Sequence, residues 1–146
     1  MYQCQLNVVD KLWLAHSFIL FFVIACFTSL RYLKTGTHCA GTIGAIGGNN
    51  EGVDSVNPDP SLMDFFIGKG LTDSGSGSTA GVLAAVEACK DSGANVISMS
   101  LGGGPFSQAS YDTYTEAYDD GVLIIAAAGN GVSYQLYRCR LPDICC

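Results

Sequence analysis

The sequence predicts an α/β fold with a doubly wound parallel sheet. Two observations support this class: strand-like and helix-like segments alternate along residues 62–128, and the connections between them are short. Strands joined through helices in this way run parallel and have right-handed crossovers. A chain of 146 residues is long enough for one compact domain. Ligands of such sheets bind beyond the carboxyl ends of the strands, so the segments that follow the strands are the first candidates for a site.

Three apolar segments predict the strands: residues 62–67 (LMDFFI), 95–100 (NVISMS) and 122–128 (VLIIAAA). All three are short and bounded by turn residues, and the second is rich in β-branched side chains. The third is apolar at every position, which is typical of a strand buried on both faces. The Gly-rich residues 35–52 favour a helix that packs closely against the sheet, because small side chains permit a close approach.

Two segments with capping signals predict the helices between these strands. Ser78 and Ser107 are suitable N-cap residues, and Gly93 and Gly121 are suitable stop signals. The first helix is amphipathic, since its apolar residues recur at helical spacing. The apolar face of the first helix is formed by Val82, Leu83, Val86 and Cys89, and one face of the second by Tyr111, Tyr114, Thr115 and Tyr118.

The N-terminal region carries 19 consecutive residues without a formal charge, residues 12–30. About 20 apolar residues span a bilayer as a helix, so the segment predicts an apolar helix that associates with a membrane or anchors the chain there. A signal peptide, and hence secretion, is one alternative, and an unrelated segment joined to the domain is another. The predicted organisation is therefore an apolar segment (1–34), an α/β domain (35–137) and a Cys-containing tail (138–146).

Charge and cysteine content exclude several classes of function. The net charge is −6, and residues 35–137 hold eleven acidic side chains against Lys69 and Lys90. Nucleic-acid binding requires clustered cations and is therefore not expected. The seven cysteines are an odd number without metal-ligand spacing, so we interpret them as buried thiols and a vicinal pair at the terminus. A disulfide framework is the alternative if the chain is exported.

Four segments together resemble the subtilisin-like serine proteases (subtilases, peptidase S8 family). Residues 35–43 (TGTHCAGTI) are similar to the H-G-T-H-V-A-G-T-I block around the catalytic histidine, and residues 75–77 (GSG) to the substrate-binding strand. Residues 95–103 (NVISMSLGG) and 126–130 (AAAGN) resemble the V-I-N-M-S-L-G-G and A-A-A-G-N blocks. The four follow the family order and cover about two-thirds of the chain. The resemblance implies a partial sheet of the subtilisin type and a peptide or protein substrate.

The resemblance also implies which residues would form the substrate cleft. A peptide would lie along both walls as an added strand, and the glycines of the first wall would leave room for its backbone. An amide after the last strand would stabilise a developing oxyanion. The first wall is Gly75, Ser76 and Gly77, the second is Ser100, Leu101 and Gly102, and the oxyanion residue is Asn130.

The resemblance does not extend to the three residues with which the family cleaves a peptide bond. Thr35 occupies the position of the catalytic histidine, and a threonine hydroxyl cannot act as a general base near neutral pH. His38 corresponds to the second, structural histidine of the block. Neither Asp10 nor the Asp73-Ser74-Gly75 sequence lies where the family has its D-[ST]-G aspartate, and the G-T-S-M-A nucleophile block is absent. The chain is therefore expected to be inactive as a peptidase.

Three further hypotheses concern ligands and alternative roles. Residues 49–53 (NNEGV) resemble a loop that binds calcium in some subtilases, but one loop does not supply six ligands, and no cofactor is expected. A membrane-tethered peptide-binding module is the alternative function. The pattern Gly75-x-Gly77-x-x-Ala80 fits a dinucleotide fingerprint, but the strand after it ends in Met99-Ser100 without the acid that the fingerprint requires.

Overall fold

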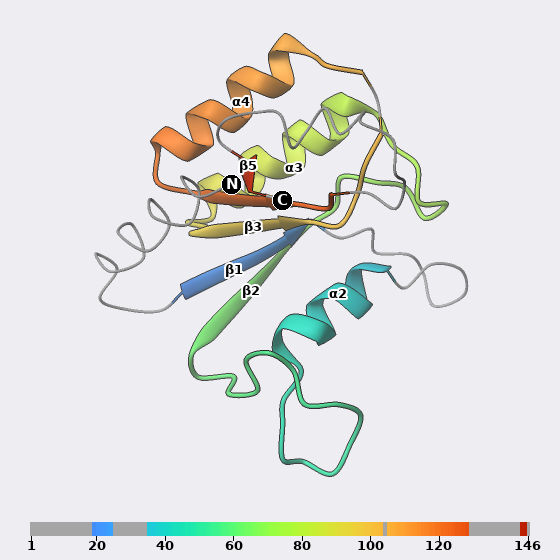
Figure 1. Cartoon of the computed structure of the whole chain (residues 1–146), viewed down its shortest axis with the longest axis vertical. Helices are drawn as coiled ribbons and strands as arrows, with labels where there is room; N and C mark the ends of the chain where they lie inside the picture. Colours follow the sequence, from blue (N-terminus) through green and yellow to red (C-terminus); the bar gives the residue numbers. More distant parts are fainter. Residues whose placement is uncertain (1–18, 25–34, 104, 129–143, 146) are drawn as a thin grey trace.

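A computed structural model of the chain describes residues 19–24, 35–103, 105–128 and 144–145. Its centre is a parallel sheet of five strands in the order β2-β1-β3-β4-β5 (Figure 1). The strands are β1 (Ile19–Ile24), β2 (Met63–Gly68), β3 (Val96–Met99), β4 (Leu123–Ala126) and β5 (Ile144–Cys145). The helices are α2 (Thr35–Gly44), α3 (Thr79–Asp91) and α4 (Gln108–Asp119).

Helices cover both faces of the sheet, which confirms the doubly wound class. Figure 1 shows α3 and α4 together above the sheet and α2 below it. The chain passes from β1 through α2 to β2 in one direction, and then returns through α3 to β3 on the far side of β1. Right-handed crossovers in opposite directions place their helices on opposite faces, so this strand order explains the two layers.

The capping residues expected from the sequence begin and end the helices. The Ser78 side chain accepts a hydrogen bond from the Gly81 N–H at 3.1 Å, and Ser107 accepts one from the Ser110 N–H at 3.3 Å. The predicted stop residues Gly93 and Gly121 both have the left-handed backbone conformation, with φ of 89° and 92°. That conformation favours glycine, so the helix ends are encoded locally.

The hydrophobic core lies between the sheet and the pair α3 and α4. On α4 only Tyr114 of the predicted face is fully buried, together with Ala117. The Cys89 thiol is completely buried, and burial raises its pKa to about 11, so it packs as a neutral apolar group. The cluster consists of Ala85, Val86, Cys89, Ala94, Ile97, Met99, Tyr114, Ala117, Val122, Ile124 and Ala126, with Leu83 and Leu101 packed against it.

Lys90 joins the two core helices at their surface. Its ammonium group lies 2.7 Å from Glu116 and 3.3 Å from Asp120 on α4, and 3.3 Å from Glu87 on its own helix. The hydrogen bond that Lys90 donates to the Glu116 carboxylate raises the pKa of Lys90 more than its contacts with Glu87 and Asp120 do. Because the three acids are solvent-exposed, each pair contributes about 0.2–1 kcal/mol or less. The network therefore fixes how α3 lies against α4 more than it stabilises the fold.

The structure corrects the expected helix at the N-terminus. Ile19–Ile24 forms strand β1, which pairs with β2 on one side and β3 on the other. A run of six apolar residues is compatible with either a buried helix or a central strand, so the apolar pattern alone does not distinguish the two. The pairing with strands on both sides identifies this segment as a central strand. The rest of residues 12–30 lies outside the described ranges. Among the residues that the structure describes, no helix is both long enough and apolar enough to cross a membrane.

The structure also corrects the expectation that the last apolar run is buried on both faces. Ile124 and Ala126 are buried against α3 and α4, but Ile125 between them is 38% exposed. The reason is the position of α2, which contacts β1 and lies beside β2, so it does not cover β4. Strand β4 is therefore buried on one face only.

Candidate substrate cleft

The strand order places a switch point between β1 and β3. After β1 the chain moves through α2 to one side, and after β3 it moves through α4 to the other. Ile24 at the end of β1 is aligned with Gly68 of β2 and Met99 of β3, so the three strands end together. In Figure 1 these ends, the loops that follow β2 and β3, and the first turn of α2 all lie at the right. A crevice for a ligand is expected at this point of an open sheet.

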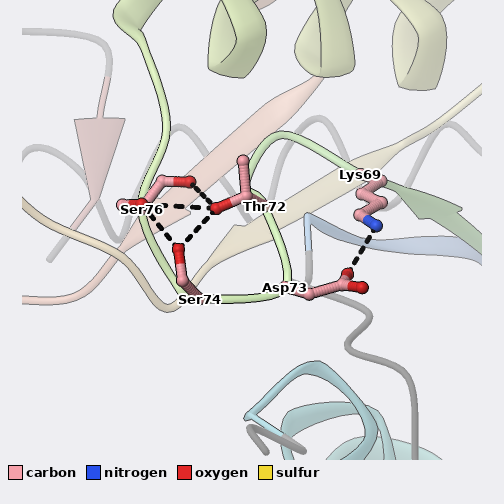
Figure 2. Close-up of polar contacts among 5 residues, drawn as sticks. All are labelled: Lys69, Thr72, Asp73, Ser74 and Ser76. Carbon is pink, nitrogen blue, oxygen red and sulfur yellow. Dashed lines mark hydrogen bonds and ion pairs between the residues drawn. The ribbon is translucent and has the colours of Figure 1, made fainter.

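The first wall segment belongs to a loop that closes on itself. Both the N–H and the hydroxyl of Thr72 donate to the Ser76 carbonyl oxygen, each at 2.7 Å. The Gly75 N–H donates to the Thr72 carbonyl at 2.9 Å, and Gly75 has a φ of 80°. Figure 2 shows the hydroxyl groups of Thr72, Ser74 and Ser76 gathered inside this turn. The loop thus has a defined shape without any ligand.

The structure adds a second reason for the two wall glycines, beside the one that the resemblance implies. We expected Gly75 and Gly77 to leave room for a peptide backbone. Gly75 adopts the left-handed conformation that the turn requires. A Cβ on Gly77 would lie 2.8 Å from the Gly70 carbonyl oxygen and 2.8 Å from Leu71 Cδ2. Both glycines are therefore required by the loop's own backbone.

A depression of about 540 Å³ lies between this loop and the first turn of α3. Lys69 and Asp73 form an ion pair of 2.7 Å in it, and both side chains are about half exposed. Such a pair contributes at most about 1 kcal/mol, so it shapes the depression more than it stabilises the domain. The lining residues are Lys69, Gly70, Leu71, Thr72, Asp73, Gly77, Ser78 and Gly81.

The second wall segment follows β3 directly. Leu101 is half-buried and packs against the core cluster, whereas Ser100 and Gly102 are exposed. The Ala127 N–H donates to the Met99 carbonyl at 3.0 Å, so the ends of β3 and β4 remain tied where the segment begins. The core thus anchors this wall through one apolar side chain and leaves its backbone accessible.

Backbone groups of both wall segments are available for a ligand. In the part of the chain that the structure describes, the N–H groups of Ser76, Gly77 and Gly102 donate no hydrogen bond. Exposed, unpaired backbone groups can pair with an extended peptide as an added strand. The two segments that the sequence singled out therefore have the properties that strand addition requires.

The remaining predicted site residues are placed only in part. Thr35 is the first residue of α2, and Figure 1 shows that this helix begins on the side of the sheet where the loops after β2 and β3 lie. Asn130 lies outside the described residues, so its proposed role stays a prediction. His38 is exposed on α2, and within the described ranges its imidazole makes no hydrogen bond to a hydroxyl group. No described serine is therefore paired with a histidine base.

The loop with the suggested calcium-binding resemblance is held by its own side chains. The Asn49 Oδ1 atom accepts a hydrogen bond from the Glu51 N–H at 2.9 Å, and Asp54 Oδ1 accepts one from the Gly48 N–H at 3.1 Å. Among the described residues, no three acidic, histidine or cysteine side chains form a group that could hold a metal ion. The expectation that this loop does not bind calcium by itself stays a prediction.

Two features of the site were not predicted from the sequence. One is Thr72, which resembles any polar loop residue until its contact with Ser76 is known. The other is β1, which ends at the switch point and is followed in the sequence by Ala25. The signal for β1 was present, because a run of β-branched and aromatic residues precedes the Gly-rich helix, as expected of a first strand.

Comparisons with known proteins agree with this geometry. The sequence profile of the Subtilase family, peptidase S8, matches residues 33–139. Subtilisin DY of Bacillus licheniformis is 41% identical over 98 residues, which are 67% of this chain and 34% of that protein. The Minor extracellular protease Epr of Bacillus subtilis (strain 168) is 35% identical over 95 residues, 65% of this chain and 14% of Epr.

A solved structure agrees in fold as well. The psychrophilic subtilisin-like protease Apa1 from the Antarctic psychrotroph Pseudoalteromonas sp. AS-11 superimposes with a TM-score of 0.65 and 30% identity, covering 86% of this chain and 34% of Apa1. The chain thus spans about a third or less of the length of these relatives. The partial parallel sheet, the two wall segments and the sequence match lead to one conclusion: the chain belongs to the subtilase family and covers part of its domain.

Proposed function

We propose that this chain binds peptides in an extended conformation along residues 75–77 and 100–102 and does not hydrolyse them. The observation that carries the proposal is the pair of exposed wall segments on either side of a switch point in the sheet. Within the described ranges, backbone N–H groups of both segments donate no hydrogen bond. Peptide or protein substrates are also what the family resemblance implies. The function is thus substrate binding by part of a subtilisin-like serine endopeptidase domain.

The sequence at the family's catalytic positions supports the proposed absence of catalysis. The family's aspartate stands at the end of the strand before the histidine block, and here that strand, β1, is followed by Ala25. The histidine position holds Thr35. An alanine methyl group cannot orient a base, and a threonine hydroxyl cannot be one. The chain would retain binding without general-base chemistry.

A fluorophosphonate probe tests the missing chemistry directly. We expect no labelling of the purified chain, because no serine that the structure describes is paired with a histidine base that could activate it. The variant Thr35→His should remain unlabelled, since it restores one catalytic group of three and triad members act as a unit. A complete subtilisin serves as the positive control. Stoichiometric labelling of a serine in the unmodified chain, detected by mass spectrometry, would refute the prediction that the chain lacks peptidase activity.

The location of the chain is a separate proposal. We infer export, which is supported by the similarity to a relative described as an extracellular protease. A C-terminally tagged chain expressed in a secreting host should then be found in the culture medium by immunoblotting of separated fractions. Recovery in the membrane fraction would favour instead the membrane-tethered form of the peptide-binding hypothesis.

A further inference from the structure

The hydroxyl groups of the loop of residues 72–76 are linked in a series of hydrogen bonds in which each hydroxyl donates to the next acceptor. The Thr72 hydroxyl has one proton and donates it to the Ser76 carbonyl oxygen at 2.7 Å. In its contact of 2.9 Å with the Ser74 hydroxyl, Thr72 must therefore accept. The hydroxyls of Ser74 and Ser76 are also 2.9 Å apart. Hydrogen bonds that run in one direction strengthen each other, and this series ends on one carbonyl group.

The Ser76 carbonyl oxygen is consequently saturated. It accepts from the N–H of Thr72 and from the hydroxyl of Thr72, so both of its lone pairs are used. This carbonyl is thus held toward the interior of the turn and is not available to a peptide. The backbone N–H of Thr72 alone would leave one lone pair free, which is why the threonine hydroxyl matters.

The orientation of the Ser76 carbonyl group determines the orientation of the Gly77 N–H group. A trans peptide bond is planar and points its C=O and N–H in opposite directions. Because the Ser76 carbonyl points toward Thr72, the Gly77 N–H points away from it. That N–H donates no hydrogen bond within the described part of the chain, and Gly77 lines the depression beside α3.

We propose that Thr72 is a positioning residue for peptide binding: its hydroxyl holds the Ser76 carbonyl inside the loop and so directs the Gly77 N–H toward an extended peptide. This inference rests on the proposed function. It adds that Thr72 determines which backbone group of the first wall forms a hydrogen bond with the peptide. Thr72 itself does not contact the peptide. It acts through the peptide plane between Ser76 and Gly77.

The test compares three variants with one probe, the blocked hexapeptide acetyl-Ala-Ala-Ala-Phe-Ala-Ala-amide, titrated calorimetrically. Thr72→Val has nearly the same shape but no hydroxyl, and we expect it to weaken binding about fivefold, the effect of one hydrogen bond. Thr72→Ser restores the hydroxyl and should bind within about twofold of the unmodified chain. The matched control is Thr42→Val, which removes an exposed hydroxyl that donates to the His38 carbonyl at 3.0 Å on α2, and it should leave affinity unchanged.

A second measurement follows the Gly77 amide by NMR in the unmodified chain. Its resonance should shift and its hydrogen exchange should slow when the hexapeptide is added, and in Thr72→Val both effects should diminish. If Thr72→Val fails to fold, the Gly77 amide of the unmodified chain still tests whether this N–H group binds the peptide. A Gly77 amide that stays unprotected in the complex would overturn the proposal.

The outcomes separate this inference from the proposed function. If the unmodified chain binds no hexapeptide at millimolar concentration, the proposed function fails. If it binds and Thr72→Val binds equally well, the proposed function stands and the role of Thr72 is refuted. Weaker binding by both Thr72→Val and Thr72→Ser would also contradict the proposal, because it would show that the hydroxyl is not the determinant.

Discussion

Replacing Ile97 with alanine should lower the free energy of unfolding by about 3 kcal/mol. The side chain lies on β3, is completely buried and belongs to the cluster beneath α3 and α4. Truncating a buried isoleucine removes its transfer free energy and leaves a cavity, with losses of about 2–5 kcal/mol. Domains of this size are stable by only about 5–15 kcal/mol, so the effect is a large part of the total. Urea titration followed by circular dichroism measures it.

The matched control is Ile125→Ala on the neighbouring strand. Ile125 is 38% exposed on the opposite face of the sheet, so the same truncation should cost less than about 1 kcal/mol. The comparison tests whether only one face of this sheet is packed. Equal losses for the two variants would show that the second face is covered as well, which would contradict the arrangement described for β4.

Replacing Gly77 with alanine should abolish most of the peptide binding. The added methyl group would lie 2.8 Å from the Gly70 carbonyl oxygen, a contact with backbone that cannot rotate away. The loop must shift, and the first wall shifts with it, so we expect affinity for the blocked hexapeptide to fall at least about tenfold. Overpacking of this kind costs about 1–3 kcal/mol of stability. Calorimetric titration and urea unfolding, performed on the same preparation, separate the two effects.

Gly41→Ala on α2 controls for the loss of a glycine as such. A Cβ at this position meets nothing within 4 Å, and the residue lies inside a helix. Alanine there should raise the free energy of unfolding by up to about 1 kcal/mol and leave peptide affinity unchanged. Gly77→Ala with undiminished affinity would mean that the first wall does not contact the peptide.

The sequence predicted the local elements of the domain well, because their signals lie within a few residues. Ser78 and Ser107 cap the two core helices as expected, and the helices end before Gly93 and Gly121. Residues 75–77 follow β2 and residues 100–102 follow β3, which agrees with the predicted order of strands and turns. Capping, periodicity and turn chemistry depend on neighbours in the chain, so they can be predicted without knowledge of the tertiary structure.

The candidate site was predictable in its location and not in its internal geometry. The family blocks identified residues 75–77 and 100–102 as candidates, but they did not indicate that a side chain at Gly77 would collide with the Gly70 carbonyl oxygen. The proposed role of Thr72 depends on the hydrogen bond that its hydroxyl donates to the Ser76 carbonyl oxygen within one turn. No composition or spacing rule distinguishes such a threonine from its neighbours.

Local residue patterns were enough to predict the α/β class and the ends of α3 and α4. The family resemblance, and not these patterns, identified the two wall segments as candidates and Thr35 at the histidine position. Two features came from the arrangement of the whole sheet: Ile19–Ile24 is a central strand, and β4 is exposed on one face. The physical reason is the range of the interactions. Helix caps and turns are satisfied by nearby residues, whereas strand pairing and burial depend on segments far apart in the chain, whose proximity follows from the whole sheet.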